Sequence, residues 1–324
     1  VESTRPARGG GREEAPPVRG AVSVRPVRRL AALALAASMG STVAAAEPPS
    51  TPEPPRPLLW EVSDGDNSVF LLGTFHLLQR SDYPLDPAVY AALDDAEAVV
   101  FELAPEDLAD PALGLRFARA GIRTDGRTLE QDLDAPTWTA LVPVAAAAGV
   151  PLEALRRMEP WFAAITLTMA GMTAAGLDPA LGLDKHLAQR AVRAGKQTIG
   201  LERPDEQIAL FDGLDARIQI DQLRDAVQRA HEIRAEAEWL HAQWREGDVD
   251  ALYWGMAAAM RARDPALFER LNTRRNLAWL QQIRARLDAA GEDDVLVAVG
   301  TLHLLGAEGL VQQLAASGYT VQRR

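Results

Sequence analysis

Short apolar runs that alternate with helix signals constrain the fold of this chain more than any other feature. They stand at residues 58–73, 98–103, 197–202, 295–300 and 319–324. The first run, "LLWEVSDGDNSVFLLG", holds turn-forming residues between two apolar halves and predicts a β-hairpin. The other runs predict strands, three of which follow helices that end near Gly195, Gly291 or Gly318. Strands that alternate with helices predict an α/β fold, in which helices flank one mixed sheet.

Between these strands the sequence predicts a large helical insertion. Asp86, which precedes a proline, starts a helix to about residue 95, and Asp248 and Asp264 start two later helices. Residues 215–246 predict one long amphipathic helix with apolar side chains along one face. Those side chains are Leu223, Val227, Ala230, Ala237, Leu240 and Trp244.

Residues 161–177, "WFAAITLTMAGMTAAGL", are apolar enough to raise the question of a membrane span. The run is 17 residues long, whereas a spanning helix needs roughly 20 apolar residues. We therefore expect a buried core helix, with Leu167 among its core side chains.

The N-terminal residues predict an exported protein. Within residues 1–46, a basic region precedes an Ala/Leu run, and Ala44-x-Ala46 offers a cleavage site that leaves Glu47 first. This pattern predicts a cleavable signal peptide and a periplasmic or secreted protein; the alternative is a membrane anchor. Residues 47–57 are rich in proline and predict an extended linker. The folded body then spans residues 58–324.

Charge and cysteine content exclude several classes of function. The chain has a net charge of −11 and no cysteine. The negative charge disfavours nucleic-acid binding, which needs clustered basic side chains. Without thiols there is no disulfide, no thiolate metal site and no cysteine nucleophile, so any metal must be held by His, Asp or Glu.

A six-residue block occurs twice, as "GTFHLL" at 73–78 and "GTLHLL" at 300–305. Each copy follows an apolar run and places a histidine, His76 or His303, just beyond the predicted strand end. Ligands of α/β proteins gather outside the carboxyl ends of strands. The block therefore predicts that two strand ends each deliver an imidazole to one shared site. The alternative is a pair of buried, hydrogen-bonded histidines.

Two glutamates stand in similar places. Glu102 follows the apolar residues "AVVF", and Glu202 closes "TIGLE". A carboxylate is costly to bury without a partner, which favours a cation beside Glu102. Two imidazoles and a carboxylate can hold a divalent metal with positions left open for water. The same groups could also act as acid and base without metal. Glu202 is a further candidate of this type, although "LERP" could form a surface ion pair.

Several motifs together resemble the TraB/GumN family (TraB/PrgY/GumN), which is related to the Tiki metalloproteases. They are "LLGTFHLL", "VVFEL", "EPW" (159–161), "GLD" (182–184), "TIGLE" with Gln207, "RRN" (274–276) and the terminal "VAVGTLHLLGAEGLVQQLAASGYTV". The resemblance covers about residues 58–324. On the matching positions it implies that His76 and His303 are the motif histidines, that Glu102 is the motif glutamate, and that Arg275 belongs to an Arg-Asn pair.

The resemblance implies a metal-dependent hydrolase, by analogy with the peptidase activity of Tiki proteins. We expect His76, His303 and Glu102 to bind a divalent ion such as Mn, Co or Zn. Glu102 or Glu202 would be ligand or base, and Arg275 would stabilise the developing oxyanion. The expected partner is a peptide or small-molecule substrate, with neither nucleic acid nor a stable membrane span after signal cleavage.

Two alternatives remain open from the sequence. One is a metal-independent, esterase-like hydrolase in which a histidine acts as general base. The other is a non-catalytic protein that binds a peptide or haem in the same cleft. The other histidines, His186, His231 and His241, are predicted to be surface or helix-packing residues.

Overall fold

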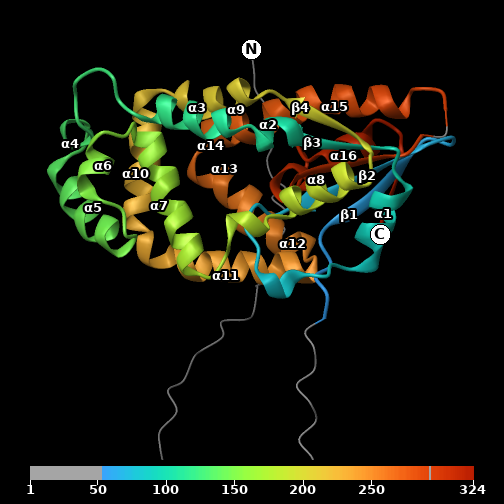
Figure 1. Ribbon diagram of the computed structural model, residues 1–324, viewed down its shortest axis with the longest axis horizontal. Helices are drawn as coiled ribbons and strands as arrows, with labels where there is room; N and C mark the ends of the chain where they lie inside the picture. Colours follow the sequence, from blue (N-terminus) through green and yellow to red (C-terminus); the bar gives the residue numbers. More distant parts are fainter. Residues whose placement is uncertain (1–52, 292) are drawn as a thin grey trace, which may run out of the picture. The chain divides into compact units, whose positions relative to one another are not determined.

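The strands form one six-stranded mixed sheet, which confirms the predicted α/β class (Figure 1). The computed structural model describes residues 53–291 and 293–324. The strands are β1 (Leu59–Ser63), β2 (Ser68–Thr74), β3 (Ala98–Leu103), β4 (Gln197–Glu202), β5 (Val295–Gly300) and β6 (Thr320–Arg323), in the spatial order β4-β3-β5-β2-β1-β6.

Four neighbouring strands run in the same direction. β2 pairs with β5, β5 with β3, and β3 with β4, all in parallel. β1 is antiparallel to both β2 and β6. The carboxyl ends of β2, β3, β4 and β5 therefore lie at the same end of the sheet, where α/β proteins gather functional groups.

The helices connect and cover these strands. The α-helices are α1 (Pro87–Asp95), α2 (Pro105–Ala109), α3 (Pro111–Gly121), α4 (Leu129–Asp132), α5 (Ala135–Ala147), α6 (Leu152–Arg156), α7 (Pro160–Ala174), α8 (Leu183–Arg193), α9 (Pro204–Asp212), α10 (Ala216–Gln228), α11 (Ala230–Glu246), α12 (Val249–Leu252), α13 (Ala259–Arg263), α14 (Pro265–Phe268), α15 (Arg274–Leu287) and α16 (Leu310–Ala316). Short 3₁₀ turns are η1 (Arg80–Asp82), η2 (Pro179–Leu181) and η5 (Thr301–Leu304). The π-helical segments are η3 (Tyr253–Ala258) and η4 (Glu269–Thr273).

The main hydrophobic core lies on the sheet. Residues Val295 to Val299 of β5 are all buried, so both faces of this central strand are covered, as is usual for parallel strands. Helices α1, α8, α15 and α16 contribute the side chains that cover it, among them Leu93, Leu187, Trp279 and Leu314.

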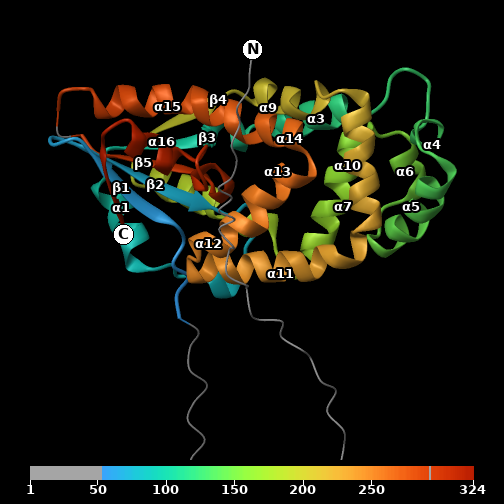
Figure 2. The same ribbon diagram turned by 180° about the vertical axis from the view of Figure 1, so that it is seen from behind.

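A second hydrophobic core lies among the inserted helices. Helices α4, α5, α6, α7 and α10 supply its buried side chains, which include Leu129, Leu141, Leu155, Leu167 and Leu223. Figures 1 and 2 agree that α4, α5 and α6 lie on the side of α7 and α10 away from the sheet. The insertion thus has a core of its own.

The prediction of one helix over residues 215–246 is wrong. The chain forms α10 and α11, separated at Arg229, and the two helices run in clearly different directions in Figures 1 and 2. The physical reason is that one apolar stripe serves different cores. Leu223 and Val227 pack in the core of the insertion, whereas Trp244 packs against the sheet.

The prediction of a buried helix over 161–177 is confirmed in α7, where Leu167 is 3% exposed. Within residues 53–291 and 293–324, no helix has the length and apolar character needed to cross a membrane.

The predicted signal peptide, residues 1–46, lies outside the described residues, as do residues 47–52 of the predicted linker. The rest of that linker contacts the body. Pro55 and Pro57 are buried, and the Arg56 N–H donates to the Arg245 carbonyl at the end of α11 (2.8 Å). The ordered body thus includes these last linker residues.

Candidate active site

The four parallel strands each deliver one predicted site residue at the same end of the sheet. Glu102 lies in β3, and Glu202 is the last residue of β4. His76 follows β2, and His303 lies in η5, directly after β5. Strand order places β5 and β3 in the middle of this row.

Gly300 marks the point at which three of these side chains meet. A Cβ atom built on Gly300 would lie 3.1 Å from Glu102 Oε1, 3.7 Å from His303 Cδ2 and 3.7 Å from His76 Nε2. The Gly300 N–H also donates to Glu102 Oε1 (2.8 Å). The structure therefore brings the two imidazoles and Glu102 together, and the absent side chain of Gly300 leaves the space between them.

The guanidinium of Arg275 links the other groups of the site. Arg275 lies on α15, directly after the π-helical segment η4. Its N–H groups donate to Glu202 Oε1 (2.7 Å from Nε), Glu102 Oε2 (2.6 Å from Nη2), His303 Nε2 (3.0 Å from Nη1) and the Leu271 carbonyl (3.2 Å from Nη1). Nη2 also lies 2.6 Å from Glu202 Oε1. Four hydrogen bonds and this short ion-pair contact therefore hold the guanidinium.

His303 is held as a neutral imidazole. Asn276 directs its amide nitrogen at the Asn272 side-chain oxygen and the Glu308 carbonyl, which leaves its Oδ1 to face His303 Nδ1 at 2.7 Å. Nδ1 therefore carries the proton, and the lone pair of Nε2 accepts from Arg275. Burial lowers the pKa of His303 to about 3, although the charge of Glu102 opposes this shift.

His76 lies in a different setting. Its side chain is 58% exposed, and its Nδ1 lies 3.1 Å from Asp184 Oδ1 at the start of α8. Desolvation lowers the pKa of His76, but the hydrogen bond and charge of Asp184, together with the charge of Glu102, outweigh it and raise the pKa above the usual range. The carboxylates of Asp184 and Glu102 therefore favour the protonated form of His76.

The two glutamates differ in acidity although they share one arginine. Burial favours the protonated form of Glu102, but the charges of Arg275 and His76 and the Gly300 N–H outweigh it and lower the pKa to about 2. Burial dominates at Glu202 and raises its pKa to about 6 in spite of Arg275. Glu102 therefore stays ionised, whereas Glu202 can exchange a proton near neutral pH.

Sequence reasoning singled out the five residues that meet here, but it missed the partners that orient the histidines. Those partners are Asp184 and Asn276, and a third neighbour, Gln207, points its amide at Glu102 Oε2 (3.4 Å). All three stand in or beside "GLD", "RRN" and "TIGLE", so the family resemblance carried the signal that could have found them.

The remaining histidines lie elsewhere. His231 is exposed, and His186 packs against Tyr83 (4.4 Å between ring centroids). His241 is buried on α11, where its Nε2 lies 2.8 Å from Asp82 Oδ2, and Arg245 forms an ion pair with the other oxygen of this carboxylate. Asp82 is fully buried in η1, so this cluster ties the loop after His76 to α11.

The donor set fits a divalent metal in part. Each imidazole engages Nδ1 in a hydrogen bond, the arrangement in which Nε2 is left as a ligand atom, and Glu102 adds a carboxylate. As they stand, no three His, Cys, Asp or Glu side chains in the described part of the chain are grouped closely enough to hold an ion. The N–H groups of Arg275 bind both His303 Nε2 and Glu102 Oε2. An ion held by these two residues would replace those bonds.

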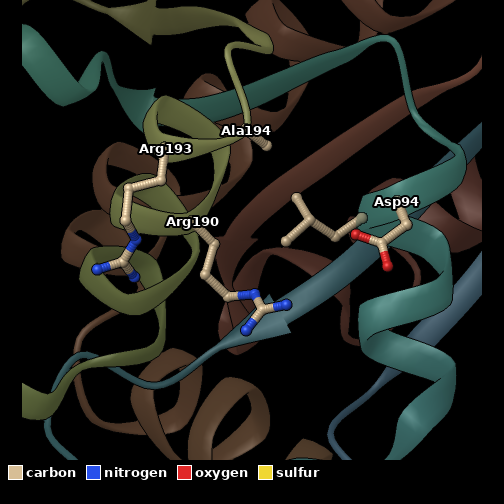
Figure 3. Close-up of a pocket in the computed structure, with 5 residues that line it drawn as sticks. Asp94, Arg190, Arg193 and Ala194 are labelled. Atoms are coloured by element: carbon tan, nitrogen blue, oxygen red, sulfur yellow. The ribbon is translucent and has the colours of Figure 1, made fainter.

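A hollow on the surface lies apart from this site. It is lined by Leu93, Asp94, Arg190, Arg193 and Ala194 (Figure 3). Arg190 and Arg193 come from α8 and Asp94 from α1. None of the five site residues lines it, so its shape has no bearing on their chemistry.

Comparisons with known proteins agree with these motifs. The model of the TraB/PrgY/gumN family matches residues 58–323. A protein of Treponema pallidum (strain Nichols), described only as uncharacterized, is 25% identical over 172 residues, which are 52% of this chain and 50% of that protein. The chain therefore matches about half the length of this curated relative. No solved structure matches the chain.

Proposed function

This chain belongs to the TraB/PrgY/gumN family, and from that premise we propose that it is an exported, metal-dependent hydrolase that cleaves peptide bonds. The observation that carries the proposal is the convergence of His76, His303 and Glu102 beside Gly300. A second carboxylate of different acidity, Glu202, shares Arg275 with this cluster. Such a pair of carboxyl groups is typical of acid–base chemistry.

His76, His303 and Glu102 would hold the ion. When bound, a divalent metal lowers the pKa of water and polarises a carbonyl group. Glu102 suits this part because its low pKa keeps it ionised. His76 gives the site an open side, since its side chain is 58% exposed while that of His303 is 5% exposed. Substrate would therefore approach from the side of His76.

Glu202 is the group suited to carry a proton. A general acid or base works best when its pKa lies near the operating pH, and burial raises the pKa of Glu202 to about 6. Its bond to Arg275 fixes the position of the carboxylate at the end of β4. In this role Glu202 takes a proton from the attacking water and returns it to the leaving amine.

Arg275 holds both carboxylates and the neutral imidazole in place. To act as the expected oxyanion donor, Arg275 would release one of the acceptors that its N–H groups now bind. The bond to the Leu271 carbonyl is the longest of those it makes (3.2 Å) and joins a neutral acceptor, so Nη1 is the donor most readily released.

Export is proposed from the signal pattern of residues 1–46. N-terminal sequencing of the protein from the cell envelope should begin at or near Glu47. Recovery of an intact 30–46 segment in membranes would contradict cleavage.

Hydrolysis is tested with purified protein that carries no histidine tag. Metal content is measured first, and quenched fluorescent peptides are then offered with Mn²⁺, Co²⁺ or Zn²⁺. Chelation should abolish cleavage, one ion should restore it, and His76→Ala and His303→Ala should each remove it. Loaded protein that cleaves no peptide in a diverse library would reject the peptidase.

A hydrolase without metal is the second candidate, favoured by the bond between Arg275 Nη1 and His303 Nε2. In that version the exposed His76 and Glu202 exchange the protons. Cleavage that persists after exhaustive chelation would support this candidate over the first.

A further inference from the structure

Residues 178–184, called the strap below, run alongside the segment that carries His76. Leu78 and Asp178 exchange two backbone hydrogen bonds (3.3 and 2.9 Å), and the Leu183 N–H donates to the Phe75 carbonyl (2.9 Å). The Tyr83 hydroxyl donates to the Leu181 carbonyl (2.7 Å). The strap is therefore joined to the chain on both sides of His76.

Gly182 allows the closest contact between the two segments. A Cβ atom at this position would lie 2.3 Å from the His76 carbonyl oxygen, and a backbone oxygen cannot swing away as a flexible side chain would. Glycine is thus required here by close approach of the His76 backbone.

Asp184 then reaches the imidazole itself. It lies in the first turn of α8, two residues after Gly182, and its side chain is 18% exposed. Its Oδ1 accepts from His76 Nδ1 at 3.1 Å, and His76 Nε2 is the atom near Gly300, Glu102 and His303. An ordinary surface ion pair would involve the two side chains alone, whereas here the backbone of both segments is also joined.

The second histidine has a matching device. Asn276 binds His303 Nδ1 through Oδ1 (2.7 Å) and the His303 carbonyl through its amide nitrogen (3.2 Å). Both histidines are thus held at Nδ1; His303 is also bound at its own carbonyl, whereas the backbone bonds beside His76 are made by Phe75 and Leu78. "GLD" and "RRN" contain these two partners.

We propose that the Gly182-Leu183-Asp184 motif is a positioning element for His76: Gly182 and Leu183 fix the backbone, and Asp184 fixes the ring so that Nε2 faces His303 and Glu102. Asp184 is a positioning residue that acts through His76. The inference rests on the proposed function only for its consequence, which is a preformed ligand atom for a divalent metal.

The test compares Asp184→Ala with Asp178→Ala, a matched control in the same strap. Asp178 Oδ1 accepts from the Ala180 N–H (2.7 Å) and does not contact the ring. Zn²⁺ alone is titrated into each metal-free protein, and thermal unfolding and crystal structures of the metal-free proteins are recorded. Loss of a hydrogen-bonding partner of a metal-binding histidine weakens binding about 10–100-fold.

We expect that weakening in Asp184→Ala, with the His76 ring displaced from Gly300, and near wild-type binding in Asp178→Ala. Asp184→Asn keeps an oxygen acceptor and should restore the ring position. Asp184→Ala with unchanged Zn²⁺ affinity and an unmoved ring would overturn the proposal, as would equal losses in the control. If the wild type binds no Zn²⁺, the metal part of the proposed function fails, and the ring position in the metal-free crystals alone decides the positioning role.

Discussion

The two Gly-Thr-x-His-Leu-Leu segments end neighbouring parallel strands, yet their histidines meet opposite surroundings. His76 is 58% exposed and faces a carboxylate, which raises its pKa. His303 is 5% exposed and lies between an amide and a guanidinium, and burial lowers its pKa to about 3. One sequence pattern therefore delivers to the same place two imidazoles whose pKa values are shifted in opposite directions.

The sheet register explains part of this difference. Thr74 pairs with Gly300, and Gly73 pairs with Val299, so the two copies are one residue out of step. In a strand, a shift of one residue turns a side chain to the other face. A Cβ atom on Gly73 would meet Leu58 and Leu304 in the core, whereas one on Gly300 would meet the site. Gly73 thus allows close packing in the core, whereas Gly300 leaves space between the side chains of the site.

A repeated sequence block determines only part of the surroundings of its residues. The block specifies where a strand ends and that a histidine follows. It does not specify the face on which its glycine lies or the group that binds its histidine, because those depend on partners far away in the sequence. Substitutions beside each copy test this contrast.

The largest effect is expected where the first copy is anchored by buried charge. Asp82→Ala leaves Arg245 and His241 without their shared carboxylate, and breaking a buried ion pair costs about 3–5 kcal/mol. Asn272→Ala removes the amide that accepts from Asn276 and donates to the Leu302 carbonyl, at a cost of about 1–3 kcal/mol. Urea unfolding measures both, and equal losses would contradict the contrast.

Truncation of the two histidines should also differ. His303→Ala leaves a cavity beside Trp279 and removes a partner from Asn276 and Arg275, which should cost about 2–4 kcal/mol. His76→Ala removes a mostly exposed ring and should cost about 1 kcal/mol or less. The free energy of unfolding in urea tests this, and a larger loss for His76→Ala would mean that the exposed ring supports the fold.

Alanine at the two glycines separates packing from access. In Gly73→Ala the new Cβ lies 2.9 Å from Thr301 Oγ1 and 3.2 Å from Leu58 Cβ, so overpacking should cost about 1–3 kcal/mol. In Gly300→Ala its nearest neighbour is Glu102 Oε1 at 3.1 Å. Stability should change less there, while Zn²⁺ binding by the site should weaken. Calorimetry of both variants decides, and the reverse pattern would contradict the register argument.

The smallest effect is the pH dependence of stability that the carboxylate of Asp82, in the turn after the first copy, should contribute. Burial raises the pKa of Asp82, but His241, the Gln79 N–H and Arg245 outweigh it, so the folded-state pKa lies below the ordinary value. The stabilisation is therefore complete above the ordinary pKa of about 3.9 and is lost as the pH falls through the folded-state value. The difference in unfolding free energy between wild type and Asp82→Asn should shrink below about pH 4. The difference in unfolding free energy between wild type and Asn272→Ala should stay constant over this pH range. If the curves of unfolding free energy against pH for wild type and Asp82→Asn are parallel, Asp82 contributes no pH-dependent stability.

Local patterns predicted most of the sheet. The expected strands at 98–103, 197–202 and 295–300 have the bounds of β3, β4 and β5, because apolar runs between turn residues have few other solutions. The break between α10 and α11 at Arg229 could not be foreseen, because the apolar spacing continues through it. Only the three-dimensional structure shows that the apolar residues before and after Arg229 pack in different cores.

The site was predictable in its residues but not in its connections. His76, His303, Glu102, Glu202 and Arg275 follow from strand ends and motifs. That Arg275 lies among the carboxylates, and that Asp184 binds His76 across 108 positions, depends on how α8 and α15 pack on the sheet. No local pattern encodes such distances.

The central place of β5 has a consequence for the order in which the fold can form. This strand lies between β2 and β3, yet its residues, 295–300, follow both by nearly 200 positions or more. During synthesis, β2 and β3 emerge long before the strand that joins them, and an unpaired apolar strand edge is a template for association with other chains. Pairing over such a separation is also slow. Until residues 295–300 are available, neither the continuous sheet nor the cluster around Gly300 can exist, so this stretch closes both in a single step.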